Sequence, residues 1–389
     1  MLFVGIDVAK DKHDCCILSS TGEEIAYFTF SNDLVGFECL ISTISSFGSL
    51  EDAKIGLEST GHYSTNIANF LLQKRLCVKI FNPLSIQLMR KAQSLRKTKT
   101  DKSDSKFLAS ILFSDDSKPY QMPVYQISEL KTLTRNRHRL VAMRSKLKLS
   151  VSRLITILFP ELPSAVYSVN QKSAYALLLK FPTAKSIAGS RLTSLTKLLS
   201  DNSHGRYGKD KALEIRTMAA NSIGLDSRAT GFELQQTIRI IQNIQSEIDI
   251  LDKEIKALMK ELHSPILTIP GIGYILGAII VAEIGNANNF ANHGKLLAFA
   301  GLEPSTYQSG KFTANNTPMV KHGSAYLRWA LLQAARLVAY RDDTFGRYYA
   351  KKKAEGKHHF VVLSHVAKKL VRVVYMLLRS NQPFMPQQA

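Results

Sequence analysis

The opening stretch of the chain, residues 2–10 (LFVGIDVAK), constrains the fold more than any other feature. It is a short apolar run with β-branched residues, which predicts a buried strand, and Asp7 lies near its centre. A buried carboxylate is strongly unfavourable unless its charge is paired or binds a cation. The fold must therefore bring partners to Asp7.

Three further acids are candidates for that environment. Glu58 ends a second apolar run, and Asp101 and Asp104 stand three residues apart, just before a helical run at 107–112. Positions i and i+3 share one face of a helix, so Asp101 and Asp104 can both face Asp7 and Glu58. Carboxylate oxygens are the ligands of Mg²⁺ (or Mn²⁺) in phosphoryl-transfer sites. We therefore expect these four acids to form a divalent-metal site.

Residues 1–125 alternate between strand-like and helix-like patterns. Strands are expected at 2–10, 15–18, 25–30, 55–58 and 77–81, and helices near 34–47 and 66–74. The first three strands are typical of an antiparallel meander. The sequence therefore predicts an α/β domain with a mixed sheet, like an RNase H fold.

Residues 126–264 predict a coiled-coil and helical linker. One seam recurs every seven positions, and a second seam follows after a helical insert at 160–230 that suggests no chemistry. Arg137 and Arg144 interrupt the first seam. The two helices are expected to pair with each other or across a dimer. The first helix has eight Lys or Arg and no acid over residues 130–160, so it could also bind along nucleic acid. The seam positions are Leu133, Leu140, Leu147 and Leu154 with Leu130, Val151 and Leu158, then Ile241, Ile244, Ile248, Leu251, Ile255, Leu258 and Leu262.

Residues 265–389 predict a mainly helical C-terminal domain. Pro270-Gly271-Ile272-Gly273 ahead of a helix at 274–283 suggests a helix-hairpin-helix, in which Gly271 and Gly273 let backbone N–H groups approach a phosphate. An irregular loop at 301–311 precedes the segment 321–328, which opens another apolar helix.

The charge balance indicates the class of partner. The 389 residues include 51 Lys or Arg against 31 acids, a formal charge of +20, which favours nucleic acid over a membrane surface. A basic run that includes Lys99 and Lys102 adjoins the acids and is expected to face phosphates. No apolar stretch is long enough to span a membrane and no signal peptide is recognised, so we expect a cytoplasmic protein with reduced cysteines.

Six short motifs resemble, in their order, the DEDD-class insertion-sequence transposases related to the Piv DNA invertase, which are described as bridge-RNA-guided recombinases. The motifs are Gly5–Lys10, Glu58–Gly61, Lys99–Asp104, Pro270–Gly273, Gly301-Leu302-x-Pro304 with Ser309-Gly310, and Lys321-x-Gly323 with Leu327-Arg328. The central helices match only in kind. One departure is Ser105, where such proteins often carry Ala, and we expect little consequence because serine is also small.

The resemblance implies a RuvC-like N-terminal domain, a coiled-coil linker and a C-terminal transposase domain with a nucleophilic serine. Asp7, Glu58, Asp101 and Asp104 would be the metal ligands, and Ser309 would form a covalent phosphoserine bond to DNA. Ser305 and Ser324 lie nearby and leave the choice of serine open. Donor and target DNA, a guide RNA and a homo-oligomer, dimer or tetramer, are the implied partners. Lys311, Lys321 and Arg328 would hold phosphates.

Three other functions are compatible with parts of the pattern. A RuvC-like structure-specific nuclease would keep the acids and use water in place of Ser309. An actin-like sugar kinase would share the motif Gly5–Ala9, but no second Gly-rich phosphate loop follows and the charge is unusual for it. A non-catalytic nucleic-acid-binding protein would leave the four acids unexplained. The sequence therefore favours a DNA transposase.

Overall fold

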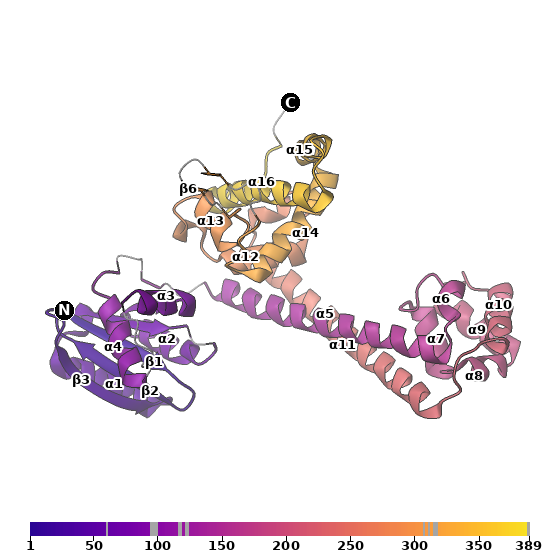
Figure 1. Ribbon diagram of the computed structural model, residues 1–389, viewed down its shortest axis with the longest axis horizontal. Coiled ribbons are helices and arrows are strands. Elements are labelled where there is room, and N and C mark those ends of the chain that lie inside the picture. The colour runs from indigo at the N-terminus through magenta and orange to yellow at the C-terminus, as the bar shows by residue number, and fades with distance from the viewer. Residues whose placement is uncertain are drawn as a thin grey trace. The chain divides into compact units, whose positions relative to one another are not determined.

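The computed structural model describes residues 1–59, 61–93, 100–115, 119–120, 124–305, 308–309, 312–313 and 318–386, with the backbone alone for Gln93 and for 308–309 and 312–313. Two compact units divide the chain, residues 1–123 and 124–389, and each is described by itself (Figure 1). Within the described residues, no helix combines the length and the apolar character needed to cross a bilayer. The predicted boundary between a linker and a C-terminal domain near residue 264 remains a prediction.

A five-stranded mixed sheet forms the centre of the first unit. Its order is β3-β2-β1-β4-β5, with β1, β2 and β3 antiparallel and β1, β4 and β5 parallel. The predicted meander and mixed sheet are therefore confirmed. The strands are β1 (Leu2–Val8), β2 (Lys12–Leu18), β3 (Glu24–Ser31), β4 (Ala53–Glu58) and β5 (Cys77–Phe81).

Helices cover both faces of this sheet (Figure 1). They are α1 (Leu34–Phe47), η1 (Leu50–Asp52), α2 (Ser64–Gln73), α3 (Pro83–Gln93) and α4 (Asp101–Ile111). Val4 and Ile6 of β1 pack in one cluster with residues of α1 and α2, whereas Phe3 packs in another with Ala109 of α4. Because successive residues of a strand point to opposite faces, Asp7 shares the α4 side of β1 with Phe3 and Gly5.

Two long helices run through the second unit. They are α5 (Tyr125–Leu158) and α11 (Arg228–Glu261), each of 34 residues, and they pack against each other. Arg137 pairs with Asp252 and Arg153 with Glu233, so the two helices are antiparallel. Intramolecular pairing, one of the two predicted arrangements, is thus present.

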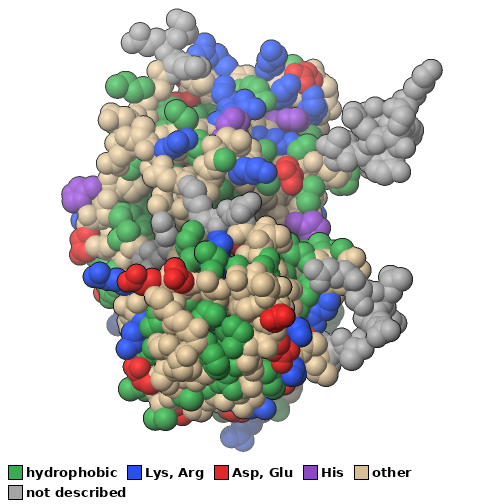
Figure 2. Space-filling model, turned by 90° about the vertical axis from the view of Figure 1, so that its left-hand side faces the viewer, with side chains coloured by type: hydrophobic (Ala, Val, Ile, Leu, Met, Phe, Trp, Pro, Cys, Tyr) green, Lys and Arg blue, Asp and Glu red, His purple; other side chains and the backbone are tan. Residues whose placement is uncertain are grey.

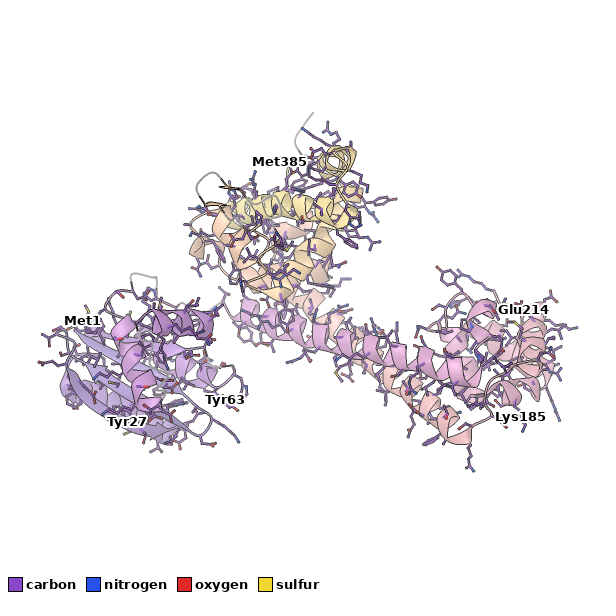
Figure 3. All side chains as sticks on the ribbon, viewed as in Figure 1. Met1, Tyr27, Tyr63, Lys185, Glu214 and Met385 are labelled. Atoms are coloured by element: carbon purple, nitrogen blue, oxygen red, sulfur yellow. The ribbon has the colours of Figure 1, made fainter. Side chains whose placement is uncertain are left out.

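Each end of the α5–α11 pair carries a group of shorter helices (Figure 1). One group is α6 (Leu162–Ala165), α7 (Lys172–Lys180), α8 (Ala184–Ala188), α9 (Leu192–Asn202) and α10 (Lys209–Ala220), in which Lys185 and Glu214 lie (Figure 3). The other comprises η2 (Pro265–Thr268), α12 (Tyr274–Ile284), η3 (Ala287–Asn289), α13 (His293–Phe299), β6 (Gln308–Ser309), β7 (Phe312–Thr313), α14 (Ala325–Arg341), α15 (Asp343–Ala354) and α16 (His359–Ser380). A short 3₁₀ helix, η2, precedes Gly271 where the helix-hairpin-helix prediction needs a helix.

Candidate active site

The sheet brings two of the four predicted acids to the carboxyl ends of neighbouring strands. β1 and β4 are parallel, with Ile6 opposite Leu57, so Asp7 and Glu58 follow at adjacent positions. Asp7 is half-buried, and Asp14 of β2 lies directly opposite it in the antiparallel register.

Helix α4 brings the other two acids to the same face of the sheet. Thr100 caps it by accepting a hydrogen bond from Ser103 N–H, and this cap starts the helix at Asp101. Asp101 is exposed and Asp104 is buried. The close approach depends on Gly5, because a Cβ there would lie 2.0 Å from Ser105 O and 2.3 Å from Ala109 N. The absence of a side chain at Gly5 therefore allows the contact that sets Asp104 beside the sheet.

Electrostatics show that the four acids lie near one another. Burial, followed by the negative charges of Asp104, Asp101 and Glu58 and then of Asp14, raises the pKa of Asp7 to about 6. Among the described residues, however, no three acidic, histidine or cysteine side chains are arranged to surround one ion. The acids therefore interact electrostatically, but their side chains are not arranged as a complete metal-binding site.

Two neighbours of the acids have roles that the sequence did not indicate. Arg90 of α3 forms an ion pair with Asp104, and its guanidinium also lies over the ring of Phe107. Tyr27 of β3 (Figure 3) donates a hydrogen bond to Asp14, which raises the pKa of Tyr27 to about 12. The sequence around Asp14 gives no sign that this acid lies beside Asp7. Its position follows from the register of β1 and β2, which only the structure shows.

Ser309 lies in the second unit, in a strand pair. β6 and β7 are antiparallel, with Ser309 opposite Phe312. The chain on either side is also paired, because Pro304 bridges Met319, Ser305 N–H donates to Pro318 O and Val320 N–H donates to Glu303 O. We name the described residues between 302 and 320 the arm; the contacts of 303–305 with 318–320 form its base.

Arg328 and two glycines close the base of this arm. Nη1 of Arg328 donates to Lys321 O at 3.0 Å and to Ala300 O at 3.3 Å. Gly301 (φ +65°) lies close to Arg328, and a Cβ there would be 2.6 Å from the same Nη1. Gly323 (φ +130°) lies close to Phe299, and a Cβ there would be 2.2 Å from Phe299 O. Three of the sequence motifs therefore contact one another at the base of the arm. They are residues 301–302, 321–323 and 327–328.

A buried acid anchors the same region. Glu283 of α12 receives two hydrogen bonds from Arg135 of α5, at 2.7 and 3.0 Å, and one from Ser324 Oγ at 2.7 Å. Ser324 in turn caps α14 by accepting from Leu327 N–H. Burial alone would raise the pKa of Glu283, but these hydrogen bonds and the charge of Arg135 hold that pKa below its ordinary value.

The predicted phosphate-binding residues lie in varied environments. Lys102 pairs with Glu24, Arg137 with Asp252, and Arg144 donates to Gln245 Oε1. Lys321 is exposed with φ +60°. Lys99 and Lys311 fall outside the described residues.

The two glycines of the predicted hairpin motif differ. Gly271 (φ +94°) packs against the backbone of α14, where a Cβ would lie 3.0 Å from Leu337 O, and so has a packing role. Gly273 is exposed at the start of α12 with open space around it. Only Gly273 is placed where a phosphate could approach.

Comparison with known proteins assigns the family. A DEDD-type model described as a transposase matches residues 4–160, and a second, described as transposase of the IS116/IS110/IS902 family, matches residues 263–350. The 44.8 kDa protein of insertion element IS116 of Streptomyces clavuligerus is 25% identical, over 99% of this chain and 96% of its own. The 42 kDa protein of IS900 of Mycobacterium paratuberculosis is 26% identical, over 99% and 97%.

A further relative adds a second kind of activity. The pilin gene-inverting protein of Moraxella bovis is 22% identical over 98% of this chain and 97% of its own. The two family models cover both the unit with the acids and the arm with Ser309. The chain therefore belongs to the IS110/IS116/IS902 family of transposases and is a DNA transposase or recombinase.

Proposed function

We propose that the enzyme cuts and rejoins DNA strands of an insertion sequence, with a divalent cation held by Asp7, Glu58, Asp101 and Asp104 and with Ser309 as the nucleophile. One observation carries the proposal: acids from β4 and α4 act together on Asp7 of β1. The strand order of the first unit supports a RuvC-like domain around them. The family also points to divalent-metal dependence.

The residues present fit Mg²⁺ or Mn²⁺. Four carboxylates supply only oxygen donors, which both cations prefer. The negative charges of the other acids repel that of Asp7, and a bound cation would relieve this repulsion. In the structure, Arg90 neutralises part of this charge at Asp104. When bound, the cation supplies a Lewis acid for a phosphate oxygen.

The serine step conserves phosphodiester bonds. Ser309 Oγ forms a bond to a DNA phosphorus while the bond from that phosphorus to a deoxyribose oxygen breaks. The serine proton passes to solvent or a base, and the leaving oxygen takes up a proton. Attack by a deoxyribose hydroxyl of another strand then reverses both changes, so no energy-rich cofactor is consumed.

Sequence choice and assembly complete the proposal. A guide RNA that selects donor and target DNA and a homo-oligomeric assembly are supported by the family resemblance alone. Lys99, Lys102, Lys311 and Lys321 are proposed as phosphate contacts on the strength of their charge and their positions in the motifs. Arg137, Arg144 and Gly271 have intramolecular roles that compete with binding.

A denaturing gel tests the serine. Purified protein, labelled donor DNA, the RNA transcribed beside the gene and Mg²⁺ are combined for wild type, Ser309→Ala and the matched control Ser305→Ala. We expect a protease-sensitive protein–DNA adduct with wild type and Ser305→Ala, and none with Ser309→Ala. Cleavage without any adduct in all three would replace the proposal with a RuvC-like nuclease that uses water.

The acids are tested separately in the same assay. Asp101→Ala removes an exposed carboxylate from the first turn of α4 and leaves the Thr100 cap in place. We expect this variant to bind DNA as wild type does and to form no adduct. Full adduct formation by Asp101→Ala would rule out the carboxylate site.

A further inference from the structure

Uncompensated positive charge is concentrated on the helix pair α15–α16. Residues 341–372 contain nine Lys or Arg against three acids. Of these acids, Asp342 is buried as the cap of α15, accepting from Phe345 N–H, and Glu355 pairs with Lys352 and Lys357. In the part of the chain that the structure describes, Lys368, Lys369 and Arg372 form no ion pair.

Several cations elsewhere are neutralised within the fold. Glu24 pairs with both Lys102 and Lys106, and Glu283 pairs with Arg135. The charge of +20 predicted a polyanionic partner without locating the surface that meets it. On α16, by contrast, no described acid forms an ion pair with Lys368, Lys369 or Arg372, and Glu355 is the one acid that pairs with Lys352 and Lys357.

The cations of the two helices form one surface. The ring of Tyr348 packs against the ammonium groups of Lys352, at 5.9 Å from its centroid, and Lys369, at 5.0 Å. Burial, then the charges of Lys368, Lys357 and Lys352, lower the pKa of His365, so these groups lie close together. We name Lys352, Lys357, His365, Lys368, Lys369 and Arg372 the basic surface. Figure 2 shows several Lys, Arg and His side chains on the upper part of the visible face.

We infer that the basic surface binds the phosphate backbone of duplex DNA. Its side chains follow α16 at intervals of one turn, from His365 to the cations Lys368 or Lys369 and on to Arg372, with Arg379 two turns further. At 1.5 Å per residue, residues 365–379 run about 21 Å, the rise of about six base pairs. A linear polyanion matches this extent better than a single small anion, and DNA is the polyanion on which a transposase acts.

Binding of non-specific DNA tests the inference without any strand cleavage. Fluorescence anisotropy with a labelled duplex of about 30 base pairs is measured in EDTA, over about 50–300 mM salt, so that no metal-dependent cleavage or adduct formation contributes. The test variant is the triple substitution Lys368→Gln, Lys369→Gln and Arg372→Gln. The control triple, Arg191→Gln, Lys197→Gln and Lys209→Gln, removes the same charge from exposed positions in the group α6–α10.

The expected result is a local and salt-dependent loss. Each lost phosphate contact lowers the slope of log Kd against log salt by about 0.9, so the test triple should lower it by about 3 and weaken binding about tenfold or more. The control triple should change affinity less than about twofold. Equal losses in both triples would reduce the effect to net charge and overturn the inference. A loss confined to an RNA duplex of equal length would also overturn it.

A single substitution keeps the test valid if the triple variant unfolds. Arg372 is exposed and forms no ion pair or hydrogen bond among the described residues, so Arg372→Gln should leave the circular dichroism spectrum and thermal midpoint unchanged. Its salt slope should fall by about 1. Arg372→Lys, which keeps the charge, should restore the wild-type slope. An unchanged slope in Arg372→Gln would contradict the inference.

Discussion

Asp7, which is half-buried, and Glu283, which is buried, show how neighbouring groups set the pKa of a carboxyl. Asp7 lies among other carboxylates, and its pKa is raised to about 6 by burial and their charges. Glu283 is even less exposed, yet its pKa is lowered because Arg135 and Ser324 outweigh the effect of burial. The first environment favours a cation from outside the protein, and the second is complete within the chain.

The Glu283 pair leads to a pH-dependent prediction. A lowered pKa stabilises the folded state above the pKa of the unfolded carboxyl, and this stabilisation is lost as pH falls through the folded pKa. Glu283→Gln should therefore lower the free energy of unfolding at pH 7 by about 3 kcal/mol, because Arg135 loses its buried partner. Below about pH 4.5 the difference from wild type should shrink. Urea unfolding followed by circular dichroism between pH 3 and pH 7 measures both.

An exposed acid provides the control for this experiment. Glu214 pairs with Lys211 on the surface of α10, with about half of its side chain in solvent. Glu214→Gln should change the free energy of unfolding by less than about 0.5 kcal/mol at either pH. If Glu283→Gln behaved like Glu214→Gln, the network of Arg135, Glu283 and Ser324 would have no role in stability.

At the scale of elements, the arm with Ser309 is positioned by contacts at its base. Arg328 holds two carbonyls from segments that flank the arm, and Ser324 ties the start of α14 to α12 through Glu283. The family resemblance suggests that Arg328 holds phosphates. Its observed hydrogen bonds indicate that it positions the arm.

Arg328→Lys separates these two roles. Lysine keeps the charge but cannot reproduce the hydrogen bonds of the planar guanidinium to Lys321 O and Ala300 O. We expect adduct formation to fall about tenfold or more, since small displacements of a nucleophile are costly. DNA affinity should stay within about twofold of wild type. The gel and the anisotropy assay measure the two effects.

The matched control lies on the same helix. Arg336 of α14 is exposed and makes no ion pair or hydrogen bond among the described residues. Arg336→Lys should leave adduct formation unchanged. Normal adduct formation by Arg328→Lys would instead assign Arg328 a simple charge contact.

At the scale of the whole molecule, the first unit has a core of its own. Its three hydrophobic clusters, around β1, α4 and α3, draw every buried member from residues 2–112. The clusters of the second unit begin at Ile127. Neither unit depends on the other for its buried apolar residues, as expected of separate domains.

A fragment of residues 1–123 should therefore fold alone. We expect a circular dichroism spectrum with both helix and strand contributions and a single cooperative thermal transition. The same fragment carrying Gly5→Val should lose the transition, because the added side chain would clash with Ser105 O and Ala109 N of α4. A wild-type fragment without cooperative unfolding would show that the first unit needs the rest of the chain.

Much of the local structure could be predicted from periodicity. The helix near 34–47 and the strand 77–81 match α1 and β5, because an apolar alternation or a helical repeat is written into consecutive residues. The prediction that Asp101 and Asp104 start a helix is also confirmed, since the Thr100 cap is a local signal. The helix-hairpin-helix and a coiled coil in the strict sense remain predictions.

The sequence by itself determined the strands, the long helices, the basic charge and the motifs that identify the family, because each depends on residue types at short spacing. Only the tertiary structure decided which charges meet. Arg135 and Glu283 are 148 positions apart, and Arg137 and Asp252 are 115 apart, so no local pattern joins them. The strand register that sets Asp14 opposite Asp7 is likewise fixed by packing. A charge acts over a few ångströms in space whatever its distance along the chain, and only the folded structure sets those distances.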